Sequence, residues 1–217
     1  MANIEQILIN NRQWVEQTTS DSPDFFGKLA EKHSPELLWI GCSDGRVSPD
    51  KLIRLPLGKI FVHRNVGNVF ASNDLNCLAV LQYAVDELKV PDIIICGHYD
   101  CGGIHRAINH HGHSPIDLWV DQIRNVYERF HDDLATVDEA RLLERCAELN
   151  VSAQVHNICR SSIVRDAWER GQKLSVHGLM YSMDNGLLKP ICSSVSSLKE
   201  WESFQSVAVI SNPATSS

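Results

Sequence analysis

The clearest predicted strand of the chain is residues 92–97, which read DIIICG. Its β-branched run lacks polar alternation, which is typical of a strand covered on both faces of a parallel sheet. Two more short apolar runs, residues 37–40 (LLWI) and 60–63 (IFVH), are predicted as strands of the same sheet. Helical spacing of apolar residues follows over 72–88. This alternation predicts an α/β fold with a mainly parallel central β-sheet flanked by helices.

The N-terminal end differs from this central pattern. Residues 4–17 have the spacing of an amphipathic helix, with a broad apolar face. A second helix is predicted over residues 23–32, with Ser22 as its cap and a proline in its first turn. We therefore expect an N-terminal helical arm over residues 1–35.

The second half of the chain predicts three further helical pieces and a hairpin. A helix capped by a serine spans about 114–130, and a capping-box pattern at 136–139 opens a long helix to about residue 160. Another helical piece reaches a glycine at 171. Residues 174–181 and 187–188 are predicted as a late hairpin around an Asp-Asn-Gly turn.

Composition and charge limit the class of protein. The chain has 217 residues, 43% of them hydrophobic and 22% charged, and a formal net charge of -7. This acidic balance argues against a nucleic-acid partner. No apolar stretch is long enough to span a membrane.

No repeat or linker divides the chain, so residues 1–217 are predicted as a single domain, with a small polar tail, 211–217, that is expected to be disordered.

Cysteine usage indicates the compartment. The chain has seven cysteines, an odd number, and its first residues lack the pattern of a secretory signal. We therefore expect a reducing, cytoplasmic setting, in which most of these thiols are small buried hydrophobic groups.

Two predicted strands end in residues that bind metals. The first is followed by Cys42, Asp44 and Arg46, and the second by His98 and Cys101. The carboxyl ends of parallel strands are where such sheets bind ligands. Two thiolates and an imidazole suit zinc, and three protein ligands leave one position open, which is the catalytic pattern. Each motif alone is a weak signal. For Cys42, Asp44 and Arg46, a strand-to-helix turn with a buried thiol and a surface ion pair would read the same way.

These residues resemble the motifs of the β-class carbonic anhydrases. The matching stretches are 42–46 (CSDGR), 64–68 (RNVGN) and 98–102 (HYDCG). One departure is Gly45, which stands where the family has serine and frees the backbone beside Asp44.

The resemblance implies a function and an assembly. It implies zinc-dependent, reversible hydration of carbon dioxide to bicarbonate and a proton, with one zinc ion on Cys42, His98 and Cys101 and attack by zinc-bound hydroxide. Asp44 and Arg46 are the implied catalytic residues, with Arg46 holding Asp44 as a carboxylate. The implied partners are carbon dioxide and bicarbonate, and the implied assembly is a homodimer or homotetramer in which the arm grips a neighbour.

The resemblance extends to a subgroup of bacterial enzymes that bicarbonate regulates. The regulatory site of that subgroup matches Trp39, Gly41, Arg64 and Tyr181. In that state Asp44 leaves Arg46 and becomes a fourth zinc ligand. The alternative is plain packing, with the two aromatic residues in strand cores and the arginine on another anion.

Other functions remain open at this stage. The same ligands would serve a hydrolase of carbon disulfide or carbonyl sulfide, or a non-catalytic zinc or bicarbonate sensor. A second metal site near the histidines at 105, 110, 111 and 113 is an alternative to a solvated polar loop, and a proton relay is a third interpretation.

Overall fold

The computed structural model describes residues 3–210, and of these the side chains up to Phe204. The predicted tail at 211–217 lies outside the described residues. The chain divides into two compact units, one ending at Ser34 and one beginning at Pro35. The assignment of residues 1–217 to a single domain stays a prediction.

The N-terminal unit consists of two helices, α1 (Ile4–Asp21) and α2 (Phe25–Glu31). Both were predicted, but the predicted cap of α2 is wrong. Ser22 ends α1 instead, where its N–H donates to the carbonyl of Thr18, because α1 runs four residues beyond the predicted end. Asp24 then becomes the cap residue of α2.

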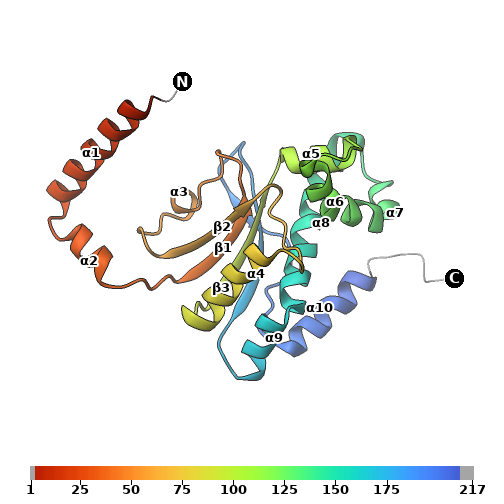
Figure 1. Cartoon of the computed structure of the whole chain (residues 1–217). Helices are drawn as coiled ribbons and strands as arrows, with labels where there is room; N and C mark the ends of the chain where they lie inside the picture. Colours follow the sequence, from red (N-terminus) through yellow and green to blue (C-terminus); the bar gives the residue numbers. More distant parts are fainter. Residues whose placement is uncertain (1–2, 211–217) are drawn as a thin grey trace. The chain divides into compact units, whose positions relative to one another are not determined.

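The second unit is built on a five-stranded sheet in the order β2-β1-β3-β4-β5 (Figure 1). Its strands are β1 (Leu37–Cys42), β2 (Ile60–Asn65), β3 (Asp92–His98), β4 (Ser175–Tyr181) and β5 (Leu188–Pro190). The first four are parallel, and β5 pairs antiparallel with β4. The predicted α/β class and the late hairpin are confirmed.

Helices cover this sheet and connect its strands. They are α3 (Pro49–Ile53), α4 (Leu75–Gln82) with a π-helical turn (Tyr83–Glu87), α5 (Gly102–Asn109), α6 (Pro115–Arg129), α7 (His131–Leu134), α8 (Glu139–Arg160), α9 (Ser162–Glu169) and α10 (Leu198–Ile210). The cap at Ser114 is confirmed as a capping box with Asp117. The capping box predicted at 136–139 is wrong, because the Thr136 hydroxyl donates to the carbonyl of Asp133 and α8 begins only after Asp138.

Alternate residues of β1 face two separate cores. Leu38, Ile40 and Cys42 lie in the larger core, while Leu37 and Trp39 lie in a smaller core on the opposite face. This alternation follows from the period of two along a strand. It places Cys42 on the face that α8 covers, since α8 packs against β3 and β4 (Figure 1).

Buried amides of α8 fix the loop that follows β2. Asn150 donates to the carbonyl of Gly67 at 2.9 Å, and Gln154 accepts from the Phe70 N–H at 3.0 Å. Satisfying buried backbone groups in this way is worth about 1–3 kcal/mol for each group that would otherwise be left unpaired. Within residues 3–210, no helix has the length and apolar character that crossing a bilayer requires.

Candidate metal centre

Three metal-binding side chains meet at the carboxyl edge of the sheet. Cys42 ends β1, His98 ends the neighbouring strand β3, and Cys101 follows just before α5. Their donor atoms all lie within 4.8 Å of one another. Two donors that bind one zinc ion at about 2.0–2.3 Å are at most about 4.6 Å apart, so the group needs little movement to hold the ion. The sequence prediction that these residues converge is therefore confirmed.

Burial and hydrogen bonding prepare this group for a metal. Cys42, His98 and Cys101 are 5%, 1% and 3% exposed. His98 donates from Nδ1 to the carbonyl of Tyr99 at 2.9 Å, which leaves its Nε2 with the lone pair. That Nε2 atom is buried and lacks a hydrogen-bond partner among the residues that the structure describes. An unpaired buried acceptor is costly, so the donor set fits a cation such as zinc.

The two sulfur atoms are strongly coupled. Cys42 Sγ and Cys101 Sγ lie 3.8 Å apart. The hydrogen bond between the two thiols lowers the pKa of Cys42, although burial opposes it, and raises the pKa of Cys101. The site therefore favours a thiolate, which is the form that binds metals.

Asp44 and Arg46 form the predicted pair beside this group. Arg46 donates to the Asp44 carboxylate from Nε at 3.0 Å and from Nη2 at 2.7 Å, and its backbone N–H donates to the same carboxylate at 2.9 Å. These bonds lower the pKa of Asp44 to about 2. Asp44 Oδ2 is 3.9 Å from His98 Nε2. The carboxylate thus lies beside the metal position while Arg46 holds it.

Gly45 does not distort this turn. A Cβ atom there would meet nothing within 4 Å, and the residue does not adopt the positive φ that favours glycine. A serine would fit the same backbone, so the departure from the family motif leaves the pair of Asp44 and Arg46 intact.

The predicted regulatory residues lie on the face of the sheet opposite to Cys42, with Tyr181 at the end of β4 and Trp39 in the middle of β1. Trp39 and Tyr181 belong to the smaller core, and Gly41 pairs in register with Arg64 across β1 and β2. Trp39 Nε1 is a buried donor without a partner among the described residues. A Cβ at Gly41 would lie 2.5 Å from that nitrogen, so only glycine leaves room for the indole.

Arg64 connects this face to the turn that carries Asp44. Its Nε donates to the carbonyl of Cys42 at 2.7 Å, and its Nη2 donates to the carbonyl of Asp44 at 2.5 Å. The same guanidinium therefore holds the backbone of a metal ligand and of the neighbouring carboxylate. The sequence motif did not reveal this contact.

Sequence reasoning also missed a buried carboxylate behind His98. Glu148 of α8 accepts from the Tyr99 hydroxyl at 2.7 Å and from Lys189 Nζ at 3.0 Å. Tyr99 supplies the carbonyl that orients His98, so this network steadies a metal ligand. The available signal was a glutamate among the apolar residues of a predicted long helix.

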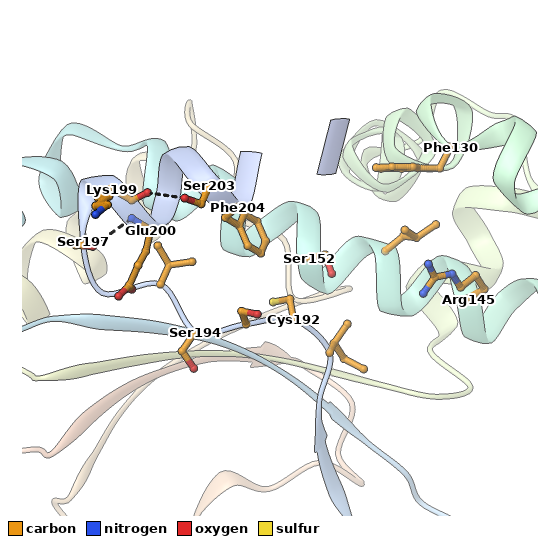
Figure 2. Close-up of a pocket in the computed structure, with 14 residues that line it drawn as sticks. Phe130, Arg145, Ser152, Cys192, Ser194, Ser197, Lys199, Glu200, Ser203 and Phe204 are labelled. Carbon is orange, nitrogen blue, oxygen red and sulfur yellow. Dashed lines mark hydrogen bonds between the residues drawn. The ribbon is translucent and has the colours of Figure 1, made fainter. Parts of the chain in front are cut away.

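The other predicted candidates do not join the centre. His105 Nε2 lies 3.4 Å from Asp100 Oδ1. The histidines at 110, 111 and 113 are exposed. A separate cavity of about 740 Å³ is lined by α8, α10 and the segment between β5 and α10 (Figure 2). Phe130, Cys192 and Phe204 line this cavity, and none of the metal-binding residues of the centre does.

Comparison with known proteins gives a consistent result. A family model described as carbonic anhydrase matches residues 37–188. A carbonic anhydrase of Emericella nidulans is 37% identical over 188 residues, covering 86% of this chain and 82% of that protein. A carbonic anhydrase of Saccharomyces cerevisiae is 33% identical over 202 residues, covering 88% and 89%.

Solved structures agree over almost the whole chain. A Coccomyxa β-carbonic anhydrase in complex with acetazolamide has a TM-score of 0.90 and 35% identity, covering 98% of this chain and 99% of that chain. One of two tetrameric β-carbonic anhydrases from Sordaria macrospora has a TM-score of 0.84 and 34% identity, covering 89% and 98%.

Proposed function

Because the chain belongs to the β-class carbonic anhydrase family, we propose that it catalyses the reversible hydration of carbon dioxide to bicarbonate and a proton. The observation that carries this proposal is the group formed by Cys42, His98 and Cys101. It has three buried donors within 4.8 Å, and a histidine nitrogen without another partner among the described residues. Three protein ligands leave a fourth position free, as in catalytic zinc sites.

The residues of this chain would hold one zinc ion and direct the reaction. When bound, zinc lowers the pKa of water and so supplies hydroxide near neutral pH. Asp44 accepts a hydrogen bond from the reacting water and orients it toward carbon dioxide. Arg46 keeps Asp44 ionised, in keeping with its pKa of about 2. An ionised Asp44 accepts hydrogen bonds and cannot donate one. In the hydrogen bond between Asp44 and the reacting water, the water is therefore the donor.

Substitution of the ligands tests this function. We expect Cys42→Ala and His98→Ala to lose both zinc, measured as metal per chain, and carbon dioxide hydration, measured by stopped flow. Cys146→Ala is the matched control, because Cys146 is a fully buried thiol of α8 outside the centre. A variant that lacks zinc and keeps full hydration activity would contradict the proposal.

We further propose that bicarbonate inhibits the enzyme at the site formed by Trp39, Gly41, Arg64 and Tyr181. Arg64 holds the carbonyls of Cys42 and Asp44. An anion bound to its guanidinium would compete with those carbonyls and loosen the turn. Asp44 would then leave Arg46 and occupy the fourth position at the metal.

Two features of this face of the sheet support the binding of bicarbonate there. Trp39 Nε1 is a buried donor that no described residue pairs with, and an oxyanion is the kind of acceptor that would satisfy it. Its surroundings in the smaller core are otherwise apolar, which strengthens the attraction between an anion and Arg64.

Bicarbonate titration tests the regulation. We expect cooperative or steep loss of hydration activity in the wild type, and a shift of that loss to higher bicarbonate in Trp39→Ala and Tyr181→Phe. Simple product inhibition that is the same in all three proteins would refute the regulatory site and leave the hydration proposal standing.

The state of the cysteines indicates the compartment in which the enzyme works. All seven cysteines are free, and six of them are buried. We infer that the protein works in a reducing compartment, as the cytoplasm provides.

A further inference from the structure

A second group of metal-binding side chains lies outside the proposed catalytic centre. It consists of His63, Asp74 and Cys77, whose donor atoms lie within 4.8 Å of one another. His63 is 7% exposed and Cys77 is fully buried, while Asp74 is partly exposed. The hydration reaction proposed above uses none of the three.

The fold brings these residues together from two elements. His63 lies on β2 and faces the same side of the sheet as Phe61, whose ring is 5.7 Å from that of Tyr83 just after α4. Asp74 is the cap of α4, and Cys77 follows three residues later, on the same face of the helix. The first turn of α4 thus presents a carboxylate and a thiol to one imidazole of the strand.

At least two of the three side chains have an oxygen or nitrogen atom that a metal ion could use as a ligand. Asp74 accepts from the Asn76 N–H through Oδ1 at 3.0 Å, which leaves Oδ2 for another partner. His63 Nε2 has only a long contact of 3.3 Å with Asn65 Nδ2. That amide is also fixed by the backbone of Val69, at 2.7 and 2.8 Å, and its bond to the ring is long at 3.3 Å, so an ion could replace it.

We propose that His63, Asp74 and Cys77 form a second binding site for a divalent cation of the zinc type. One sulfur, one nitrogen and one carboxylate oxygen match zinc, cadmium and cobalt, and do not match calcium or magnesium, which take oxygen ligands. The three donor atoms lie within 4.8 Å of one another, and two bonds to one zinc ion span about 4.6 Å. Small side-chain rotations would close the three donors around an ion.

This site is distinct from the catalytic centre. In the register of the sheet, His63 is paired with Ile40, while Cys42 is paired with Asn65. The strand spacing and rise place the Cα atoms of His63 and Cys42 about 8 Å apart. This separation is too large for one ion to bind both groups, and Asn65, the register partner of Cys42, contacts His63 through its side chain.

Binding at this site has a clear proton balance and an entry path. Burial raises the pKa of the Cys77 thiol to about 12, so the bond from sulfur to the metal replaces the bond from sulfur to hydrogen and releases one proton to solvent.

The cation would enter past Asp74, where the residues on either side are exposed. A bound ion would join β2 to α4 and thereby restrain the loop between them, which borders the catalytic centre.

Metal counting on the full chain tests the proposal. The protein is stripped with a chelator, loaded with one equivalent of zinc and then titrated with cadmium. We expect a total of two metal ions per chain, and an ultraviolet absorption band from a thiolate bound to cadmium. Neither readout depends on hydration activity, so failure here leaves the proposed function untouched.

Three variants make the assignment specific. Cys77→Ser removes the thiol and should lower the total to one metal ion per chain and weaken the band relative to the wild type. Asp74→Asn keeps a good helix cap and should weaken cadmium binding by about tenfold or more, since losing even an outer-shell partner of a metal costs about 10- to 100-fold. Cys146→Ser removes a buried thiol of the same kind elsewhere and should change neither readout.

The opposite results are equally clear. Zinc-loaded wild type that takes up no second ion would overturn the proposal. So would a thiolate band that is as intense in Cys77→Ser as in the wild type, or cadmium affinity that is unchanged in Asp74→Asn.

Discussion

Arg46 shares its guanidinium between two carboxylates at the mouth of the metal centre. It contacts Asp44 at 2.7 Å and Asp100 at 3.3 Å, and its own side chain is 54% exposed. Such exposed pairs add little to stability. The value of this pair lies in orientation, because a planar guanidinium fixes both oxygens of Asp44 beside His98.

Replacement of Arg46 should therefore affect rate more than folding. We expect Arg46→Leu to lower kcat/KM for carbon dioxide by roughly 10- to 100-fold, as the loss of a charge-assisted hydrogen bond of about 1.5–3 kcal/mol implies. Zinc content should stay at the wild-type level. Stopped-flow hydration and metal analysis check both points.

Arg46→Lys is the informative companion variant. Lysine keeps the charge but loses the two-pronged geometry, so we expect an intermediate rate. Equal rates for wild type and Arg46→Leu would show that Asp44 needs no such orientation.

Single residues of the centre could be predicted because the ends of parallel strands share one edge. Cys42, His98 and Cys101 follow directly from that rule. The contacts of Arg64 with the turn, and the unpartnered indole of Trp39, could not be predicted, because they depend on side-chain orientations across neighbouring strands. The group of His63, Asp74 and Cys77 was missed because its members show no common motif.

Among the elements, β1 depends on a glycine for its smaller core. We expect Gly41→Ala to destabilise the protein by about 1–3 kcal/mol, the usual cost of overpacking a core. The reason is the 2.5 Å approach of a new Cβ to the buried indole of Trp39. Urea unfolding measures the change, and a shifted response to bicarbonate should accompany it.

Gly45→Ala provides a matched control for stability in the adjoining turn. A Cβ there meets nothing within 4 Å, so we expect a change within about 0.5 kcal/mol. A similar loss in both variants would mean that backbone freedom, not the fit of Trp39, decides the residue at 41.

Helix α8 carries a histidine that should make stability depend on pH. Burial lowers the pKa of His156, and the charges of Arg129 and Arg160 lower it further. Its ring lies against Trp201 of α10, at 6.2 Å between centroids. The unfolded chain, with an ordinary histidine pKa near 6.5, therefore binds the proton more readily than the folded chain.

The lowered pKa of His156 sets the direction in which stability changes with pH. As pH falls through about 6.5, the wild type loses stability because protonation favours the unfolded state. We expect His156→Gln to lose less between pH 7.5 and 5.5, measured by urea unfolding at both values. His131→Gln, which changes an exposed histidine of α7, should behave as the wild type does. An equal loss in His156→Gln and the wild type would contradict the assignment.

Element types could be predicted more reliably than their ends. The starts of α2 and α8 were misplaced because a neighbouring element had already engaged the predicted cap residue, Ser22 in one case and Thr136 in the other. The short helices α3 and α7 have too few residues to show a period. The predicted 72–88 helix contains a change to a π-helical turn, which apolar spacing does not reveal.

At the scale of the whole molecule, the parallel class could be predicted but the strand order could not. The runs at 37–40, 60–63 and 92–97 are similarly apolar, so the pattern does not say which is central. In the structure β1 lies between β2 and β3, and this order makes Cys42 and His98 neighbours. The centre thus depends on a feature that only tertiary packing determines.

The N-terminal unit leaves an apolar helix face without burial. No residue of α1 is buried, although Ile4, Ile7 and Leu8 lie on one side of it and are 65%, 48% and 50% exposed. An exposed apolar stripe of this kind marks a protein interface. We therefore expect this chain to form an oligomer in which α1 packs on another copy, as the sequence predicts.

Charged substitutions on this face test the assembly. We expect the double variant Ile7→Glu, Leu8→Glu to shift the mass in solution from a dimer or tetramer toward the monomer, because burying two carboxylates in an apolar interface is costly. Multi-angle light scattering after size-exclusion chromatography measures that mass. Gln13→Glu adds a charge at an exposed position away from the apolar side and should leave the mass unchanged. Wild-type mass in the double variant would show that α1 does not hold the assembly together.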